Sequence, residues 1–249
     1  MTETAPREPV FQAPAVVTAC IAVFVAVHAV RQFVAADIDQ QIILNLAFFP
    51  ARFGAAGSQL PGPDWLAYTS MVTHALLHGD WSHLLLNSAW FLAFGTMIAR
   101  RTGTWRFLVF LMVCAAAGAI AFLLANPGQI IPIVGASGAI SGLMGAAFRV
   151  LFSALDQGGI SLLQHVPRLI PRMPLQIALT DRRVVVATLA WVGINLLFAW
   201  GLSGVLTQGE IAWEAHLGGF AAGFLAFALF DCGRGWSPPD RDVSHPVPH

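Results

Sequence analysis

Long apolar stretches separated by short polar connections run along the chain as far as residue 230. A helix needs roughly 20 apolar residues to cross a hydrocarbon core about 30 Å thick. Six stretches reach or approach that length: Ala13–Val30, Leu84–Ala99, Trp105–Ala125, Ile130–Phe152, Val184–Leu202 and Ile211–Phe230. The second is short, but the mixed apolar residues before it can extend it. The pattern therefore predicts an all-α polytopic membrane protein with six spans.

Composition supports this fold class and excludes others. Of the 249 residues, 57% are hydrophobic and only 10% are charged, whereas soluble domains average roughly 25% charged residues. High hydrophobicity with low charge excludes a disordered chain. A net charge of zero with no basic block argues against nucleic-acid binding. The three cysteines are far apart in the sequence, which is typical of apolar packing rather than of a disulfide framework or a metal cluster.

The arginines predict the orientation of the chain in the membrane. All 13 basic residues are arginine, and with a cytoplasmic N-terminus only Arg31 and Arg52 fall outside. The positive-inside rule then predicts that both termini are cytoplasmic, and we expect the cell (inner) membrane as the location.

The predicted domains are a cytoplasmic segment 1–12, a membrane domain 13–232 with an inner loop at about 153–183, and a disordered cytoplasmic tail 233–249. No cleavable signal is obvious, so the first stretch is expected to be retained.

The longest outer connection, Arg31–Trp81, has an apolar middle at residues 42–50 that is too short to span twice. We expect this connection to lie in the membrane interface. Trp65 and Tyr68 would suit the level of the lipid headgroups there.

Polar side chains inside membrane spans are costly and indicate function by default. His83 and Asn87 lie four residues apart at the start of the second stretch, so they share one helix face. Hydrogen bonding between helices is the alternative role for such a pair. His74 and His78 have a chelating spacing, but no His-Glu-x-x-His motif or suitably spaced carboxylate accompanies them, and no metal site is expected.

The fourth stretch is expected to change from non-helical to helical backbone close after Gly135. Two prolines and a glycine argue against helix in residues 126–134, and non-helical backbone at membrane depth must be buried in protein or line a water-filled cavity. Ser137 is therefore expected to begin a helix, with unpaired backbone N–H groups beside it. That geometry suits a nucleophile whose oxyanion needs stabilisation. Taken alone, Gly-x-Ser-Gly fits helix packing as well.

The sixth stretch supplies a candidate base, His216. Gly219 and Gly223 lie near the same helix face as His216, and Gly138 and Gly142 form a similar stripe on the fourth stretch. Two such faces allow close backbone approach, which would bring His216 within reach of the Ser137 hydroxyl. A hydroxyl nucleophile needs a base of this kind. A structural, hydrogen-bonded histidine is the alternative.

Three motifs together resemble the rhomboid family of intramembrane serine proteases: His83-x-x-x-Asn87, Gly135-x-Ser137-Gly138 and Ala215-His216-x-x-Gly219-x-x-x-Gly223. The resemblance implies a six-helix bundle with a membrane-embedded first outer loop. It implies Ser137 as nucleophile, His216 as general base, and oxyanion stabilisation by His83, Asn87 and the Ser137 N–H. It also implies transmembrane segments of other proteins as substrates, without a metal or organic cofactor. The termini and the inner loop lie outside the resemblance.

Two departures from the family pattern affect the site. Ser141 stands where some members carry a tyrosine that stacks on the catalytic histidine, so the orientation of His216 must rest on another contact. Residues 49–53 stand in place of the Trp-Arg pair often found in the first loop.

Two functions are alternatives to a protease. One is a non-catalytic relative that binds transmembrane helices, and the other is a small transporter or channel using His83, Asn87 and Glu214. The sequence leaves substrate identity and oligomeric state open.

Overall fold

The computed structural model describes residues 13–197, 199 and 212–233. The predicted segment 1–12 and all of the tail after Gly233 lie outside these residues. The α-helices are α1 (Ala15–Phe33), α2 (Ala36–Leu46), α3 (Trp65–Thr73), α4 (Trp81–Trp90), α5 (Thr96–Thr102), α6 (Thr104–Ala125), α7 (Ser137–Asp156), α8 (Ser161–His165), α9 (Leu175–Ala178), α10 (Arg182–Leu197) and α12 (Trp213–Phe230). Short 3-10 turns connect them at Pro50–Phe53, Ala55–Gln59, His74–Leu76 and Pro167–Leu169.

Among the described residues, five helices are long and apolar enough to cross a membrane. They are α1, the continuous run Trp81–Thr102 formed by α4, a π-helical turn at Phe91–Gly95 and α5, then α6, α7 and α12. Large apolar side chains such as Leu124 and Leu229 point outward, with exposed fractions of 76% and 82%. Lipid, rather than water, is a suitable environment for such surfaces. The chain is therefore a multi-pass, all-α membrane protein, as the apolar pattern predicts.

Three of the differences between the helix bounds and the predicted stretches affect the interpretation. The second span begins at Trp81, not Leu84, because the Asp80 side chain caps it. The fourth is helical only from Ser137 and continues to Asp156, so it takes the first residues of the predicted inner loop. The fifth prediction corresponds to α10, whose described part ends at Leu197, and the rest of that prediction lies outside the described residues.

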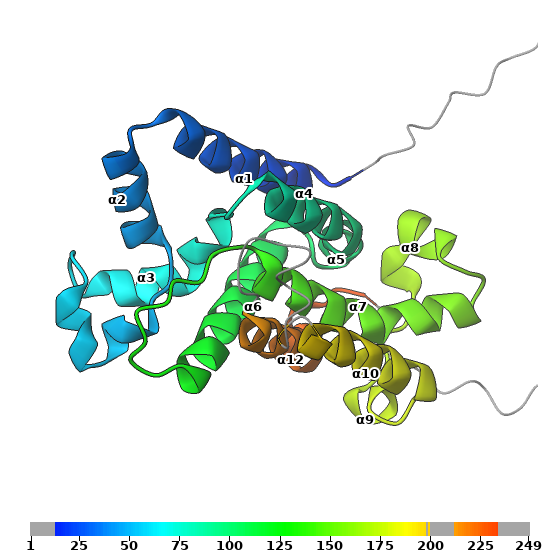
Figure 1. The fold of residues 1–249 in the computed structure, drawn as a ribbon. Coiled ribbons are helices and arrows are strands. Elements are labelled where there is room, and N and C mark those ends of the chain that lie inside the picture. The colour runs from blue at the N-terminus through cyan, green and yellow to red at the C-terminus, as the bar shows by residue number, and fades with distance from the viewer. Residues whose placement is uncertain (1–12, 198, 200–211, 234–249) are drawn as a thin grey trace, which may run out of the picture.

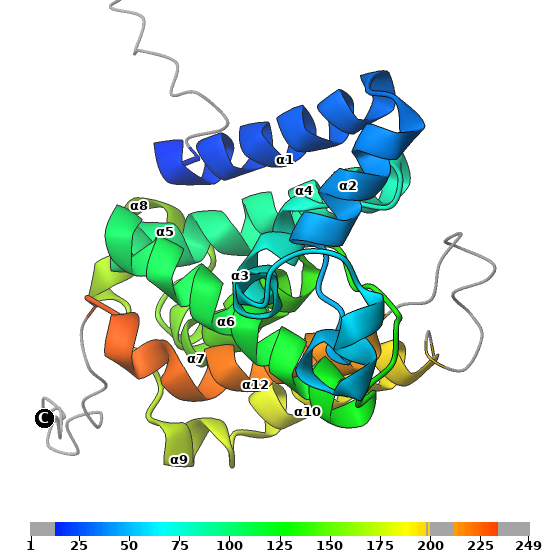
Figure 2. The same ribbon diagram turned by 90° about the vertical axis from the view of Figure 1, so that its left-hand side faces the viewer.

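The centre of the bundle is formed by α6, α7 and α12 (Figures 1 and 2). Helix α7 is the most deeply enclosed of the candidate spans, because 78% of its most apolar 18-residue stretch is buried inside the protein. Small residues explain this enclosure, because a Cβ on Gly118 of α6 would lie 2.7 Å from the Ala215 carbonyl oxygen of α12. The three helices consequently contact one another through their backbones.

The connection Arg31–Trp81, predicted to lie on the outer side, folds against one end of the bundle. Figures 1 and 2 place α2 at that end and α8 at the other. The Arg52 guanidinium closes the connection by donating to the carbonyl oxygens of Leu44 and Pro61, at 2.9 and 3.0 Å. Trp65 and Tyr68 are exposed, as side chains at a membrane interface would be. Whether this connection is embedded in the membrane stays a prediction.

A buried ion-pair network ties together the α8 end of the bundle. Arg101 donates to both carboxylate oxygens of Asp231, at 2.9 and 2.8 Å, and both side chains are fully buried. Arg101 also donates to the carbonyl oxygens of Pro167 and Ile170. Arg172 reaches Asp231 at 3.2 Å. The end of α12 is thereby attached to α5 and to the loop between α7 and α10, which the sequence predicts to lie on the inner side.

We expect Asp231→Ala to destabilise the protein by about 3–5 kcal/mol, because it leaves the buried Arg101 guanidinium without a counter-charge. The measurement is the unfolding midpoint in mixed micelles. Asp156→Ala is the matched control: it breaks an exposed pair with Arg183, and exposed pairs contribute about 0–1 kcal/mol. Equal shifts for the two variants would contradict the expectation.

Candidate active site

Helix α4 presents His83 and Asn87 in its first two turns. The Asp80 carboxylate caps the helix by accepting the His83 backbone N–H at 2.8 Å, and it also accepts the Ser82 hydroxyl at 2.5 Å. These two hydrogen bonds, led by the Ser82 hydroxyl, hold the pKa of Asp80 below its usual range. Asn87 is buried, and His83 is partly buried. The cap therefore fixes the helix turn that carries His83.

The non-helical segment before Ser137 is attached to the outer connection by backbone hydrogen bonds. Phe48 and Ile133 exchange two such bonds as an isolated antiparallel bridge. The Gly135 N–H donates to the His74 carbonyl at 3.0 Å. Gly135 has a φ of +114°, a left-handed conformation that favours glycine. The chain then turns directly into α7, whose first residue is Ser137.

Close contact between α7 and α12 brings the candidate nucleophile to the candidate base. A Cβ on Gly219 would lie 1.9 Å from the Gly138 carbonyl oxygen, and a Cβ on Gly223 would lie 1.9 Å from the Gly142 carbonyl oxygen. At this separation His216 Nε2 lies 2.7 Å from Ser137 Oγ, across 79 residues of sequence. The structure thus places all four of these predicted glycines at the helix contact beside the pair.

His83 and Asn87 converge on the same site from the other side. A methyl group on Gly135 would lie 2.8 Å from His83 Nε2 and 3.5 Å from Asn87 Nδ2. The Gly79 N–H approaches His83 Nδ1 at 3.5 Å, an arrangement that leaves the Nε2 hydrogen free to donate. Asn87 Nδ2 is buried without a hydrogen-bond partner among the described residues. A buried donor of this kind is available to a developing negative charge.

One residue of this cluster was not predicted from the sequence. Asn195 of α10 places its Oδ1 atom 2.7 Å from His216 Nδ1, which is the orienting contact that Ser141 does not supply. Ser141 Oγ instead donates to the Ser137 carbonyl oxygen at 2.8 Å. Asn195 could have been singled out from the sequence because it is a polar side chain within an apolar, membrane-spanning stretch.

The histidines considered as metal ligands have other surroundings. His74 Nδ1 donates to the Ser70 carbonyl oxygen at 2.9 Å, and the His78 ring packs against Phe24 and His83. Within the described ranges, no group of three His, Cys, Asp or Glu side chains is arranged to hold a metal ion.

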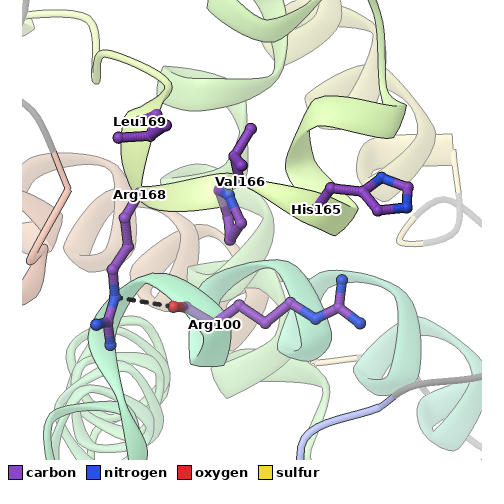
Figure 3. A pocket seen from close by; sticks show the side chains of 6 residues that line it. Arg100, His165, Val166, Arg168 and Leu169 are labelled. Carbon is purple, nitrogen blue, oxygen red and sulfur yellow. Dashed lines mark hydrogen bonds between the residues drawn. The ribbon is translucent and has the colours of Figure 1, made fainter.

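A separate surface pocket lies at the α8 end of the protein. Figure 3 shows its lining side chains, with Arg168 donating to the Arg100 carbonyl oxygen. None of the side chains of the candidate site lines this pocket: His83, Asn87, Ser137, Asn195 and His216 all lie elsewhere. The candidate active site is therefore the contact of α4, α7, α10 and α12.

Comparison with known proteins identifies the family of the chain. The family model of the rhomboid domain matches residues 66–231, more than half of the chain. The match includes the inner loop, which the motifs had left outside the resemblance. Rhomboid protease GluP of Bacillus subtilis (strain 168) is 28% identical over 183 residues, which are 71% of this chain. That alignment spans only 28% of the length of the relative. The chain belongs to the rhomboid family.

Proposed function

We propose that this protein is an intramembrane serine endopeptidase that cleaves peptide bonds in or near transmembrane segments of other membrane proteins. One observation carries the proposal: the 2.7 Å contact between Ser137 Oγ and His216 Nε2 at the start of a buried helix. Rhomboid membership and the named protease relative support the same reaction class.

In this reaction Ser137 Oγ attacks the carbonyl carbon of the scissile bond and transfers its proton to His216 Nε2. The oxyanion accepts hydrogen bonds from His83, Asn87 and the Ser137 backbone N–H, which has no partner within the first helical turn. His216 then gives the proton to the leaving amine as the C–N bond breaks, leaving an acyl-enzyme. Water, deprotonated by His216, hydrolyses the ester and restores Ser137.

The orientation and location stay part of the proposal. Arg101, Arg149, Arg168 and Arg172 gather near the inner loop at the α8 end. Arg31 lies at the α2 end, where it pairs with Asp39. By the positive-inside rule the α8 end and both termini face the cytoplasm, and the protein resides in the cell membrane. The substrate's scissile bond would reach Ser137 from the α2 half of the bilayer.

The test is covalent labelling of the purified protein with a fluorophosphonate probe, in parallel with cleavage of a transmembrane substrate in liposomes. We expect labelling of the wild type and none of Ser137→Ala. Wild-type protein that is neither labelled nor active would support the non-catalytic alternative. The transporter alternative requires solute flux that does not depend on Ser137. Glu214, one of the three residues suggested for a transport path, accepts a hydrogen bond from Asn126 Nδ2 at 3.3 Å.

Asn87→Ala is expected to lower kcat on the order of 10²-fold while leaving KM nearly unchanged, because its donor acts on charge that develops only in the transition state. His83→Ala should behave similarly. Ser88→Ala, the next position on the same helix, is the control for α4 packing. Effects of Asn87→Ala and His83→Ala confined to KM or to the unfolding midpoint would instead support a structural role as hydrogen bonds between helices.

A further inference from the structure

The imidazole of His216 is held on both of its nitrogens. Nε2 faces Ser137 Oγ at 2.7 Å, and Nδ1 faces Asn195 Oδ1 at 2.7 Å. Asn195 has an exposed fraction of only 6% and comes from α10, a helix that carries neither member of the pair. The His216 ring thus lies between two polar partners from two different helices.

A third contact determines which way the Asn195 amide points. Asn195 Nδ2 donates to the Trp191 carbonyl oxygen at 2.8 Å. A carbonyl oxygen can only accept, so the NH₂ group must face Trp191 and the oxygen must face His216. An amide oxygen accepts only as well, which requires the proton of neutral His216 on Nδ1. The Nε2 lone pair is then directed at the Ser137 hydroxyl.

Packing between α10 and α12 holds this arrangement in register. The Trp191 ring stacks on Phe220, with centroids 4.5 Å apart and planes 18° apart. Trp191 precedes Asn195 by four residues, and Phe220 follows His216 by four, so both contacts lie on one face of each helix. The aromatic stack therefore positions the asparagine one turn away.

We propose that Asn195 is the positioning residue for the general base: it selects the Nδ1–H tautomer of His216 and orients the ring toward Ser137. This inference rests on the proposed function, because it assigns His216 the role of base. The wrong histidine tautomer costs about 10⁴ in kcat in a soluble triad protease. A neutral amide stabilises the imidazolium less than a carboxylate does, so we expect loss of Asn195 to cost about 10–10²-fold.

The experiment compares Asn195→Leu, which removes the acceptor at similar size, with Asn195→Asp, which keeps it. In full-length protein, Asn195→Leu should lower kcat and the rate of fluorophosphonate labelling together, by about 10–10²-fold, with KM within about twofold. Asn195→Asp should recover most of the lost kcat. Leu197→Ala, at an exposed position on the same helix, is the packing control and should match the wild type.

A spectroscopic readout makes the test independent of activity. In ¹⁵N-histidine spectra, the His216 signals, identified by their loss in His216→Ala, should show a protonated Nδ1 and an unprotonated Nε2. Asn195→Leu should give a mixture of tautomers. Unchanged kcat in Asn195→Leu, an effect on KM or stability alone, or an Nε2–H tautomer in the wild type would overturn the inference. An unlabelled wild type would overturn the proposed function, while the tautomer would still decide the positioning role.

Discussion

Gly219→Ala is expected to abolish substrate cleavage and to lower the unfolding midpoint, and Gly223→Ala should do the same. The new Cβ would lie 1.9 Å from a backbone carbonyl oxygen of α7 in both variants. No side-chain rotation can relieve a contact with backbone, so α7 and α12 must separate. Misplacement of reacting groups by about 1 Å can cost on the order of 10²-fold in rate.

Separation of α7 and α12 in a bilayer should also lower the stability of the protein. Helix association in lipid has no hydrophobic driving force and depends on close van der Waals packing. The two variants should therefore lose stability as well as activity, and Gly219→Ala should affect the rate more, because its contact is with Gly138, the neighbour of Ser137. Cleavage rates and unfolding midpoints of both variants test this.

Gly193→Ala is the matched glycine control. Its Cβ would meet nothing within 4 Å, and alanine is favoured over glycine inside a helix by about 0.5–1 kcal/mol. This variant should keep its activity and be as stable as the wild type or slightly more so. Wild-type rates in both Gly219→Ala and Gly223→Ala would contradict the close-contact account of the site.

Much of the fold follows from local features of the sequence. Apolar stretches of membrane-spanning length predict the long helices because the lipid environment requires internally satisfied backbone. The start of α7 at Ser137 was predictable because Pro127 and Pro132 prevent helix before it. The approach of α7 and α12 could be inferred from glycines spaced by four. Each of these features acts within one or two turns of chain.

The contacts that could not be predicted depend on how helices rotate against one another. The apolar stretch containing Asn195 does not indicate which face of α10 meets α12, so its pairing with His216 required the tertiary structure. The bridge between Phe48 and Ile133 joins segments 85 residues apart with no matching sequence pattern. The Asp80 cap is local, but the apolar pattern alone places the helix start three residues late.

Ser137→Ala and His216→Ala are each expected to lower the cleavage rate by on the order of 10⁴–10⁶-fold, and the double variant should be no slower than either single variant. The non-additivity follows from the roles proposed for the pair. A hydroxyl without its base is a poor nucleophile, and a base without the hydroxyl has no proton to take, so removing either one removes the shared step. Two independent contributions would instead multiply.

Ser153→Ala is the control for this double-mutant cycle, because it makes the same change on the same helix toward its other end. It should retain wild-type cleavage. All four variants should unfold at similar midpoints, since the substitutions remove polar atoms without adding volume to the α7–α12 contact. Substantial turnover in Ser137→Ala would exclude it as nucleophile. Multiplicative losses in the double variant would separate His216 from Ser137 and return His216 to a structural role.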